Sequence, residues 1–314
     1  MRPKPPVRYL LVIASALVGW TLLVLPLARV EPFLLTATYL FFLYSINSVA
    51  WNIPGGLTGL FSLGNAMFFG VGGFAFAHLF RQFGSIVPAL LAAPLFSVGL
   101  VAVLMPAMRL RGPFFMLSTL TLSIIVYIVL LNWVEVSGGG QGFFIQQLML
   151  LEREVPLVLS LAILISAVIA FGFLKYSYLG LAMASIRDDE EGAVSLAVPP
   201  LFVKSVAMVF SAYITGLAGA VHALYLSYVH VDAFNSVSLS LTAALTTILG
   251  GQGVVLGSII GGLVNALIYF YVTAGFGEVS LAFYGSLLVI ITLIEPRGVS
   301  YFFYRRSGLK IFSI

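Results

Sequence analysis

Side chains that usually carry enzyme chemistry are few in this sequence and widely separated. His78, His222 and His230 fall in three different regions, and the chain contains no cysteine. No His pair has the H-x-x-x-H or H-E-x-x-H spacing of a metal site, and no nucleophile is matched with a base. No Gly-Lys pair occurs, so the chain lacks the phosphate-binding loop of a nucleotide-hydrolysing subunit. We therefore expect no catalytic residue, no metal ion and no other cofactor.

The polar residues within the long apolar stretches are neutral and recur at helical spacing. They could line a path for a solute or hydrogen-bond one helix to another, which is the commoner role for a single residue. Asp, Glu, Lys and Arg are absent from the middle of these stretches, which argues against coupling to a proton or sodium gradient. The candidate pathway residues are Ser45, Asn47, Ser48, Asn52, Ser62, Asn65, Thr119, Thr242 and Thr246.

The composition places these residues in a membrane. Of the 314 residues, 61% are hydrophobic and only 8% are charged, whereas soluble domains carry about a quarter charged residues. So little polar surface cannot cover a water-soluble globule, and lipid must be the main solvent. The basic residues behind the net charge of +4 are scattered, which argues against a nucleic-acid partner. The predicted fold class is an all-α polytopic integral membrane protein.

The uncharged stretches indicate how often the chain crosses the bilayer, since a spanning helix needs about 20 mostly apolar residues. The stretches 32–80 and 233–277 are long enough for two crossings each, and six others for one, which predicts about ten spans. These six are residues 9–28, 82–108, 112–134, 155–174, 205–231 and 279–294.

The basic residues orient this arrangement. With the amino terminus inside, 12 of the 15 Lys and Arg fall in inside segments, in agreement with the positive-inside rule. One span more or fewer would exchange the sides of all later loops, so the count and the orientation support each other. We therefore expect both termini in the cytoplasm and a single transmembrane domain over residues 1–314.

Both double crossings turn at glycine-rich segments without charge, residues 54–59 and 250–253. These segments are either short inside loops or the breaks of interrupted helices, whose backbone finds hydrogen-bond partners within the protein. Small residues also recur at i, i+4 spacing, which predicts faces where helix backbones approach closely. The two rows are Ala212, Gly216 and Ala220, and Gly257 and Gly261.

The inside segment 175–204 is the longest polar excursion between spans. It fits two short helices separated near residues 187–189, with acidic residues at the start of the second helix, where the helix dipole favours them. A solvated loop would leave its apolar residues with nothing to contact, so we expect a cytoplasmic partner. The residues expected to couple to that partner are Ile186, Arg187, Asp188, Asp189, Glu190, Glu191, Leu196 and Val198.

Several stretches together resemble a known family. Residues 56–74, GLTGLFSLGNAMFFGVGGF, are similar to the glycine-serine signature of LivM/LivH-type permeases, the membrane subunits of bacterial branched-chain amino acid ABC importers. Four stretches agree in the same order: RLRG at 109–112, SGGGQG at 137–142, IRDDE at 186–190 and ILGGQG at 248–253. The first two point to the LivM type. Asn65 departs from the family's frequent His or Gln, and Ala197 from its usual Gly.

The resemblance implies a permease subunit in the bacterial cytoplasmic (inner) membrane that takes branched-chain or related amino acids from a periplasmic binding protein. It also implies a second, LivH-like permease and two ATP-binding subunits as partners, with the pathway between the two permeases. Two alternatives stay open: the same type of importer with urea, a short amide or a sugar as cargo, and a stand-alone channel for a small neutral solute. The segment 175–204 favours an importer, since a channel has no reason to carry a docking segment.

Overall fold

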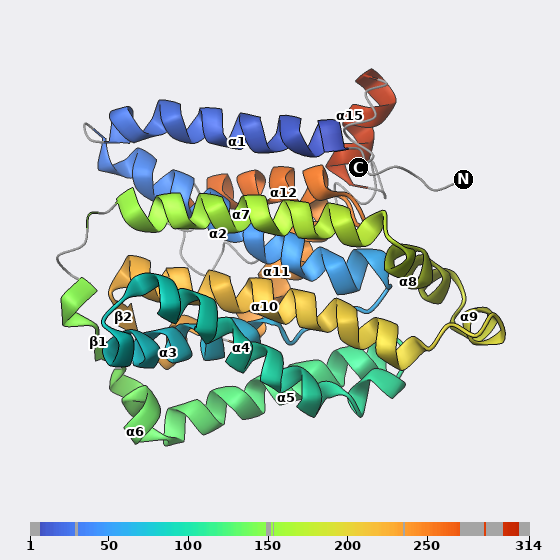
Figure 1. Cartoon of the computed structure of the whole chain (residues 1–314), viewed down its shortest axis with the longest axis horizontal. Helices are drawn as coiled ribbons and strands as arrows, with labels where there is room; N and C mark the ends of the chain where they lie inside the picture. The colour runs from blue at the N-terminus through green and yellow to red at the C-terminus, as the bar shows by residue number, and fades with distance from the viewer. Residues whose placement is uncertain are drawn as a thin grey trace.

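The computed structural model describes residues 7–28, 31–148, 152, 154–234, 236–270, 286 and 298–307. These residues are almost entirely helical (Figure 1). The α-helices are α1 (Val7–Ala28), α2 (Pro32–Asn52), α3 (Asn65–Phe83), α4 (Ile86–Leu104), α5 (Pro113–Asn132), α6 (Val134–Ser137), α7 (Glu154–Lys175), α8 (Tyr178–Asp188), α9 (Glu190–Ser195), α10 (Pro200–Leu226), α11 (Ser236–Gly250), α12 (Val255–Ile268) and α15 (Val299–Ser307). Two short strands, β1 (Phe143–Phe144) and β2 (Tyr228–Val229), pair antiparallel.

Local sequence explains several helix ends. Pro32, Pro113 and Pro200 stand at the starts of α2, α5 and α10, where the missing N–H leaves no hydrogen bond unmade and the fixed φ suits a helix. Gly84 ends α3 in the left-handed conformation, which a residue without a Cβ adopts at no steric cost.

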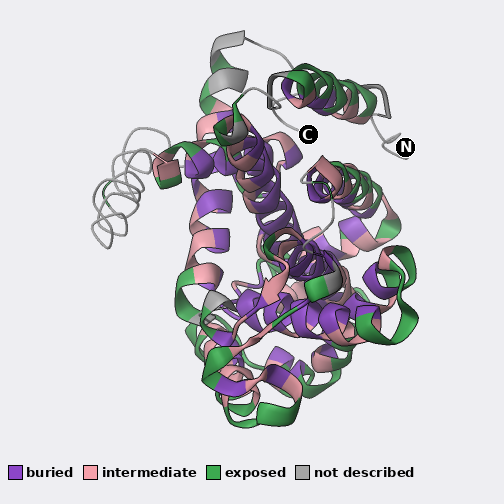
Figure 2. Cartoon of the chain, turned by 90° about the vertical axis from the view of Figure 1, so that its left-hand side faces the viewer, coloured by how far each residue is buried: buried purple, intermediate pink, exposed green. Residues whose placement is uncertain are grey.

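The long helices have the length and apolarity of membrane spans. Six of those described qualify alone, namely α1, α2 with its extension to Leu57, α4, α5, α7 and α10, and the bent pair of α11 and α12 makes seven. Large apolar side chains such as Leu22 of α1 and Leu95 of α4 are exposed on the outside of the bundle, while the buried residues gather at its centre (Figure 2). Such faces suit lipid or another membrane subunit. The chain is therefore an all-α, multi-pass membrane protein.

The predicted number of ten spans is not confirmed. The first nine expected spans each coincide with a helix, but α3 is not among those apolar enough to cross a bilayer. It carries Asn65, His78 and Arg81. The tenth, 279–294, lies outside the described residues except for Ser286. The structure thus supports six or seven spans among the residues it describes.

The bundle has two distinct ends (Figure 1). We call the end that carries α8 and α9 the coupling end; α6 and the β1–β2 ribbon lie at the opposite end. Leu10, near the start of α1, packs against Gly172, near the end of α7 that leads to α8. Gly298, just before α15, packs against Gly251, close to the carbonyl that Lys175 of α7 binds. Both ends of the described chain therefore lie at the coupling end.

The predicted rows of small residues are confirmed as close-packing faces. Gly216 of α10 packs against Pro94 and Ser97 of α4, and a Cβ added at Gly72 of α3 would lie 2.3 Å from the carbonyl oxygen of Gly216. Gly219, which lies outside the predicted row, is as close to α3, because a Cβ there would overlap the carbonyl oxygen of Phe69. Gly257 and Gly261 of α12 meet the backbone of α11 in the same way. These glycines let α10 cross α3, and α12 cross α11, at backbone distance.

The two glycine-rich segments differ in structure. After α2 the chain forms one π-helical turn, η1 (Ile53–Leu57), and then runs without helix until α3 begins at Asn65, a fully buried residue. The first segment is thus the start of a break inside the protein. The second is a tight turn, because α11 and α12 are bent by 119° across four residues. α12 then lies along α2, with Gly262 against Ser45.

Candidate functional site

The unwound segment 58–64 is held by hydrogen bonds from three sides. The indole Nε1 of Trp51 donates to the carbonyl oxygen of Ser62 at 2.7 Å. The amide of Leu63 donates to Oγ1 of Thr119 in α5 at 3.0 Å, and that of Gly64 to Oγ of Ser62 at 3.1 Å. An apolar interior supplies no water to these groups, so the side chains must satisfy the exposed backbone. Ser62 and Thr119 therefore stabilise the break.

Four further polar residues tie α2, α11 and α12 together. The hydroxyl oxygens of Ser48 and Thr247 lie 2.9 Å apart, and Thr246 Oγ1 accepts from Asn265 Nδ2 at 2.7 Å. Ser48 and Thr246, predicted as pathway residues, thus make bonds between helices. Such bonds contribute on average ~0.6 kcal/mol each in membranes.

Asn52 makes the densest set of these contacts. Its Oδ1 accepts from the amide of Gly253 at 2.7 Å, while its Nδ2 donates to the carbonyl of Val254 at 3.0 Å and to Oγ of Ser258 at 2.9 Å. The side chain is fully buried and fills the space between the two glycine-rich segments. Asn52 therefore has a structural role in this conformation.

Among the predicted pathway residues, Asn65, Ser45 and Asn47 bury polar atoms that have no hydrogen-bond partner. Asn65 is fully buried at the first turn of α3, and neither of its amide atoms is hydrogen-bonded. The hydroxyl of Ser45 and Oδ1 of Asn47 are likewise unpartnered. An unmade bond in the interior costs about 1–3 kcal/mol, so such groups favour binding a polar solute or water. Thr242 is half-buried on α11.

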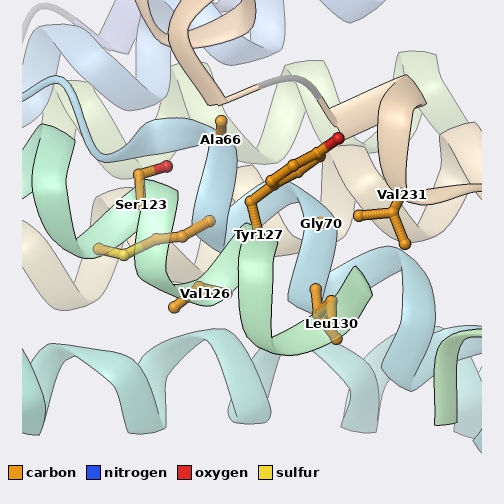
Figure 3. Close-up of a pocket in the computed structure, with 8 residues that line it drawn as sticks. Ala66, Gly70, Ser123, Val126, Tyr127, Leu130 and Val231 are labelled. Atoms are coloured by element: carbon orange, nitrogen blue, oxygen red, sulfur yellow. The ribbon is translucent and has the colours of Figure 1, made fainter. Parts of the chain in front are cut away.

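A small cavity lies beside the first turns of α3, between α3 and α5 (Figure 3). It offers about 10 Å³ to the centre of a water molecule, and the buried hydroxyl of Ser123 on its wall has no partner. Tyr127, also on its wall, donates to Oδ1 of Asp232 at 2.5 Å and so joins α5 to the loop before α11. The cavity has room for about one water. A solute larger than water could enter here only after α3 and α5 move apart.

The segment 175–204, called the coupling segment from here on, folds as predicted into two short helices separated near residues 187–189. α8 is capped by Ser177, whose Oγ accepts from the amide of Gly180. α9 is capped by Asp189, whose Oδ1 accepts from the amide of Glu191 at 3.0 Å. Asp189, predicted to couple to a partner, therefore serves as an N-cap within the chain.

Two more acidic residues of this segment pair inside the chain. Glu190 lies 2.8 Å from Nζ of Lys204, whose side chain is only 4% exposed, and Glu191 accepts from Arg111 Nη1 at 2.8 Å. The hydrogen bond to Glu191 and the charge of Glu190 raise the pKa of Arg111. These contacts anchor α9 to the start of α10 and to the connection between α4 and α5.

The apolar residues of the segment divide into two groups. Ile186 is buried and Val198 half-buried, and both pack on the main core of the bundle. Leu196 is 77% exposed, and Tyr178, Leu181 and Val194 are also exposed. We call these four residues the docking face. Ile186, predicted to contact a partner, instead faces the protein, because one side of α8 must cover α7 and α10.

Arg187 connects α8 to the first glycine-rich segment. Its Nη1 donates to the carbonyl oxygen of Gly56 at 3.1 Å, while its Nε pairs with Asp188 at 3.2 Å. Gly59 has a φ of +71°, and a Cβ there would lie 2.9 Å from Cγ of Arg187. Arg187 therefore binds the backbone of the break at close range.

Residues 33–292 match the model of a protein family described as the permease component of branched-chain amino acid transport systems. The chain belongs to this permease family. It is similar to the high-affinity branched-chain amino acid transport system permease protein LivM of Escherichia coli K12, at 26% identity over 82% of this permease and 67% of that protein. The LivM protein of Salmonella typhimurium LT2 is 27% identical over the same shares. No solved structure matches the permease.

The structure also adds residues to the site that sequence reasoning missed. Arg111 and Lys204 anchor α9, Trp51 holds the unwound segment, and Ser240 Oγ accepts from the amide of Ala66 in the first turn of α3 at 3.0 Å. The two basic residues flank apolar stretches in the sequence, where they indicated topology and, for Arg111, the family resemblance, but no contact with α9. Nothing in the sequence pairs Trp51 or Ser240 with the positions they contact.

Proposed function

We propose that this permease is one membrane subunit of a bacterial ABC importer in the cytoplasmic (inner) membrane. Its cargo is a branched-chain or related amino acid delivered by a periplasmic binding protein. A second, LivH-like permease completes the pathway, and two separate subunits hydrolyse ATP. The family match and the names of the two relatives support the cargo. The chain itself acts as a single transmembrane domain over residues 1–314 without enzymatic activity.

The observation that carries this proposal is the arrangement of the coupling segment. Ion pairs join α9 to the bundle and the buried Ile186 joins α8 to it, yet Tyr178, Leu181, Val194 and Leu196 face outward. An apolar projection on a polar end of a membrane protein suits binding in a groove of a cytoplasmic protein. An ATP-binding subunit that docks there could move the helices attached to α8.

The proposal is tested by reconstitution of the permease in liposomes, with leucine as the test solute. Uptake should require the second permease, the ATP-binding subunits, the binding protein and ATP together, because the unpartnered groups of the pathway lie in a closed interior. The permease alone, matched to empty liposomes, should show only background uptake. Rapid uptake by the permease alone, down a gradient and without ATP, would instead establish a stand-alone channel.

The same proposal places the coupling end in the cytoplasm, together with both termini. The positive-inside bias and the position of Leu10 and Gly298 at the coupling end support this orientation. The chain has no native cysteine, so single cysteines report cleanly. In intact cells whose outer membrane has been permeabilised, a cysteine at Gly140 should react with a membrane-impermeant maleimide, and one at Asp189 should react only after the inner membrane is opened. The reverse pattern would invert the topology.

Two asparagine variants distinguish a residue that lines the pathway from one that stabilises the fold. Asn65→Leu leaves every described hydrogen bond in place, so we expect a normal folded level with uptake changed severalfold or with altered preference among leucine, isoleucine and valine. Asn52→Leu removes three hydrogen bonds, each worth about 0.5–1.5 kcal/mol, and should lower the folded level. Fluorescence-detected size-exclusion chromatography measures the folded level, and uptake is measured in parallel. Normal uptake and preference with Asn65→Leu would remove that residue from the pathway.

A further inference from the structure

The two glycine-rich segments, far apart in sequence, meet at the coupling end of the bundle. Asn52 bridges them, with its Oδ1 on the amide of Gly253 and its own helix running into the π-helical turn that contains Gly56. A Cβ added at Gly56 would lie 2.5 Å from the amide nitrogen of Gly253. The backbones of the π-helical turn η1 and of the α11–α12 turn are therefore in direct contact.

Two basic side chains of the coupling segment bind the two glycine-rich segments where these meet. Arg187 of α8 donates to the carbonyl of Gly56, and Lys175, at the end of α7, donates to the carbonyl of Gly253 at 2.7 Å. Each cation thus holds one of the two segments. Charged donors make shorter and stronger hydrogen bonds than neutral ones, and a buried carbonyl that loses its donor pays for desolvation.

We propose that Arg187 is a positioning residue that transmits movement of α8 to the transmembrane helices. We call its hydrogen bond to Gly56, together with that of Lys175 to Gly253, the inside lock. In the state described here the bond from Arg187 to Gly56 keeps the break of α2 against the α11–α12 turn and closes the pathway at the coupling end. When a bound subunit displaces α8, Arg187 either releases the Gly56 carbonyl or pulls it along. The chain then bends at the unwound segment 58–64. The inference rests on the proposed function only for the identity of the subunit that moves α8.

The residue acts through the backbone of its own chain, not as a contact for the ATP-binding subunit. This distinguishes Arg187 from the docking face, whose four exposed side chains lie on α8, on α9 and just after α9. The proposed role also predicts that removal of Arg187 lowers transport but not ATP hydrolysis, because the ATP-binding subunit still binds.

The test compares Arg187→Ala with Arg109→Ala, which removes an exposed arginine before α5. In the assembled importer we expect Arg187→Ala to retain the ATP-binding subunits and their ATP hydrolysis, and to lose about tenfold in leucine uptake, the effect of one strong hydrogen bond. Arg187→Lys, which restores a charged donor, should recover part of the uptake. Arg109→Ala should match the unchanged protein.

A second readout needs no partner subunit and so tests the lock even if the proposed transport function fails. Thr58 is buried directly after the π-helical turn, and a cysteine placed there reports opening of the break. Its reaction with a maleimide in membranes should be several times faster with Arg187→Ala. It should also be faster with Gly59→Ala, whose added Cβ would lie 2.9 Å from Cγ of Arg187 and displace it. Unchanged labelling and uptake with Arg187→Ala overturn the lock. Loss of the ATP-binding subunits with this variant overturns it too, and makes Arg187 a docking residue.

Discussion

Leu196→Asp is expected to abolish binding of the ATP-binding subunit and, with it, ATP-driven uptake. Leu196 is the most exposed large apolar side chain described in the permease, at 77% of its surface. Full burial of a leucine contributes about 1.5–3 kcal/mol, which corresponds to roughly ten- to hundredfold in affinity. An aspartate in the same groove loses this term and adds the cost of burying a charge. Co-purification of the ATP-binding subunit in mild detergent, scored beside uptake, measures the effect.

Two variants in the adjoining helix α9 serve as controls. Ser195→Asp introduces the same charge one residue away and keeps Leu196, so it should reduce co-purification far less. Glu191→Ala removes an exposed ion pair with Arg111, and exposed pairs contribute only ~0–1 kcal/mol, so its effect should also be small. Full co-purification and uptake with Leu196→Asp would mean that the docking face is a solvated surface, and would revive the reading of this chain as a channel.

The second large effect, on stability, is expected from the addition of a single methyl group. Gly219→Ala should sharply lower the folded level of the permease, because the added Cβ would overlap the carbonyl oxygen of Phe69. Backbone cannot give way as a flexible side chain does, so α10 and α3 would have to separate. Overpacking of this kind costs typically ~1–3 kcal/mol and occasionally more. The temperature at which half of the detergent-solubilised protein aggregates measures the loss.

Gly99→Ala provides the matched control, since it makes the same chemical change in the neighbouring helix α4. A Cβ at Gly99 meets nothing within 4 Å. Alanine favours a helix over glycine by about 1 kcal/mol, so this variant should be as stable as the unchanged protein or slightly more stable. Equal thermal stability of Gly219→Ala and Gly99→Ala would contradict the close crossing of α3 and α10.

Both predictions depend on features that could be only partly predicted from the sequence. The rows of small residues are visible in the sequence, because i, i+4 spacing places residues on one helix face whatever surrounds them. Gly219 lies outside both rows, and its contact is not visible in the sequence either, since Phe69 lies 150 residues earlier in the chain. Leu196 was predicted to face a partner on hydrophobicity alone, and the same argument placed Ile186 there, although Ile186 is buried. Hydrophobicity shows that a side chain will be covered, but the packing of α8 decides what covers it.

The candidate pathway illustrates the same division. The sequence alone identifies neutral polar residues within apolar spans, because charge and hydropathy are properties of each residue. Only the structure separates Asn52, with three hydrogen bonds, from Asn65, with none. The two have the same side chain, and the difference lies in the segment packed against each one.

By itself, the sequence determined that this is a multi-pass helical membrane protein, where most of its helices lie, and that the segment 175–204 forms two short helices. These follow from local patterns of apolar, charged and glycine residues over one or two helical turns. The tertiary structure alone decided that the first glycine-rich segment leads into an unwound chain and the second is a tight turn. It also decided that Glu190 and Glu191 bind Lys204 and Arg111, and that Arg187 holds Gly56. Gly56 and Arg187 are 131 residues apart, and no local pattern records which distant backbone a side chain will meet once the helices pack.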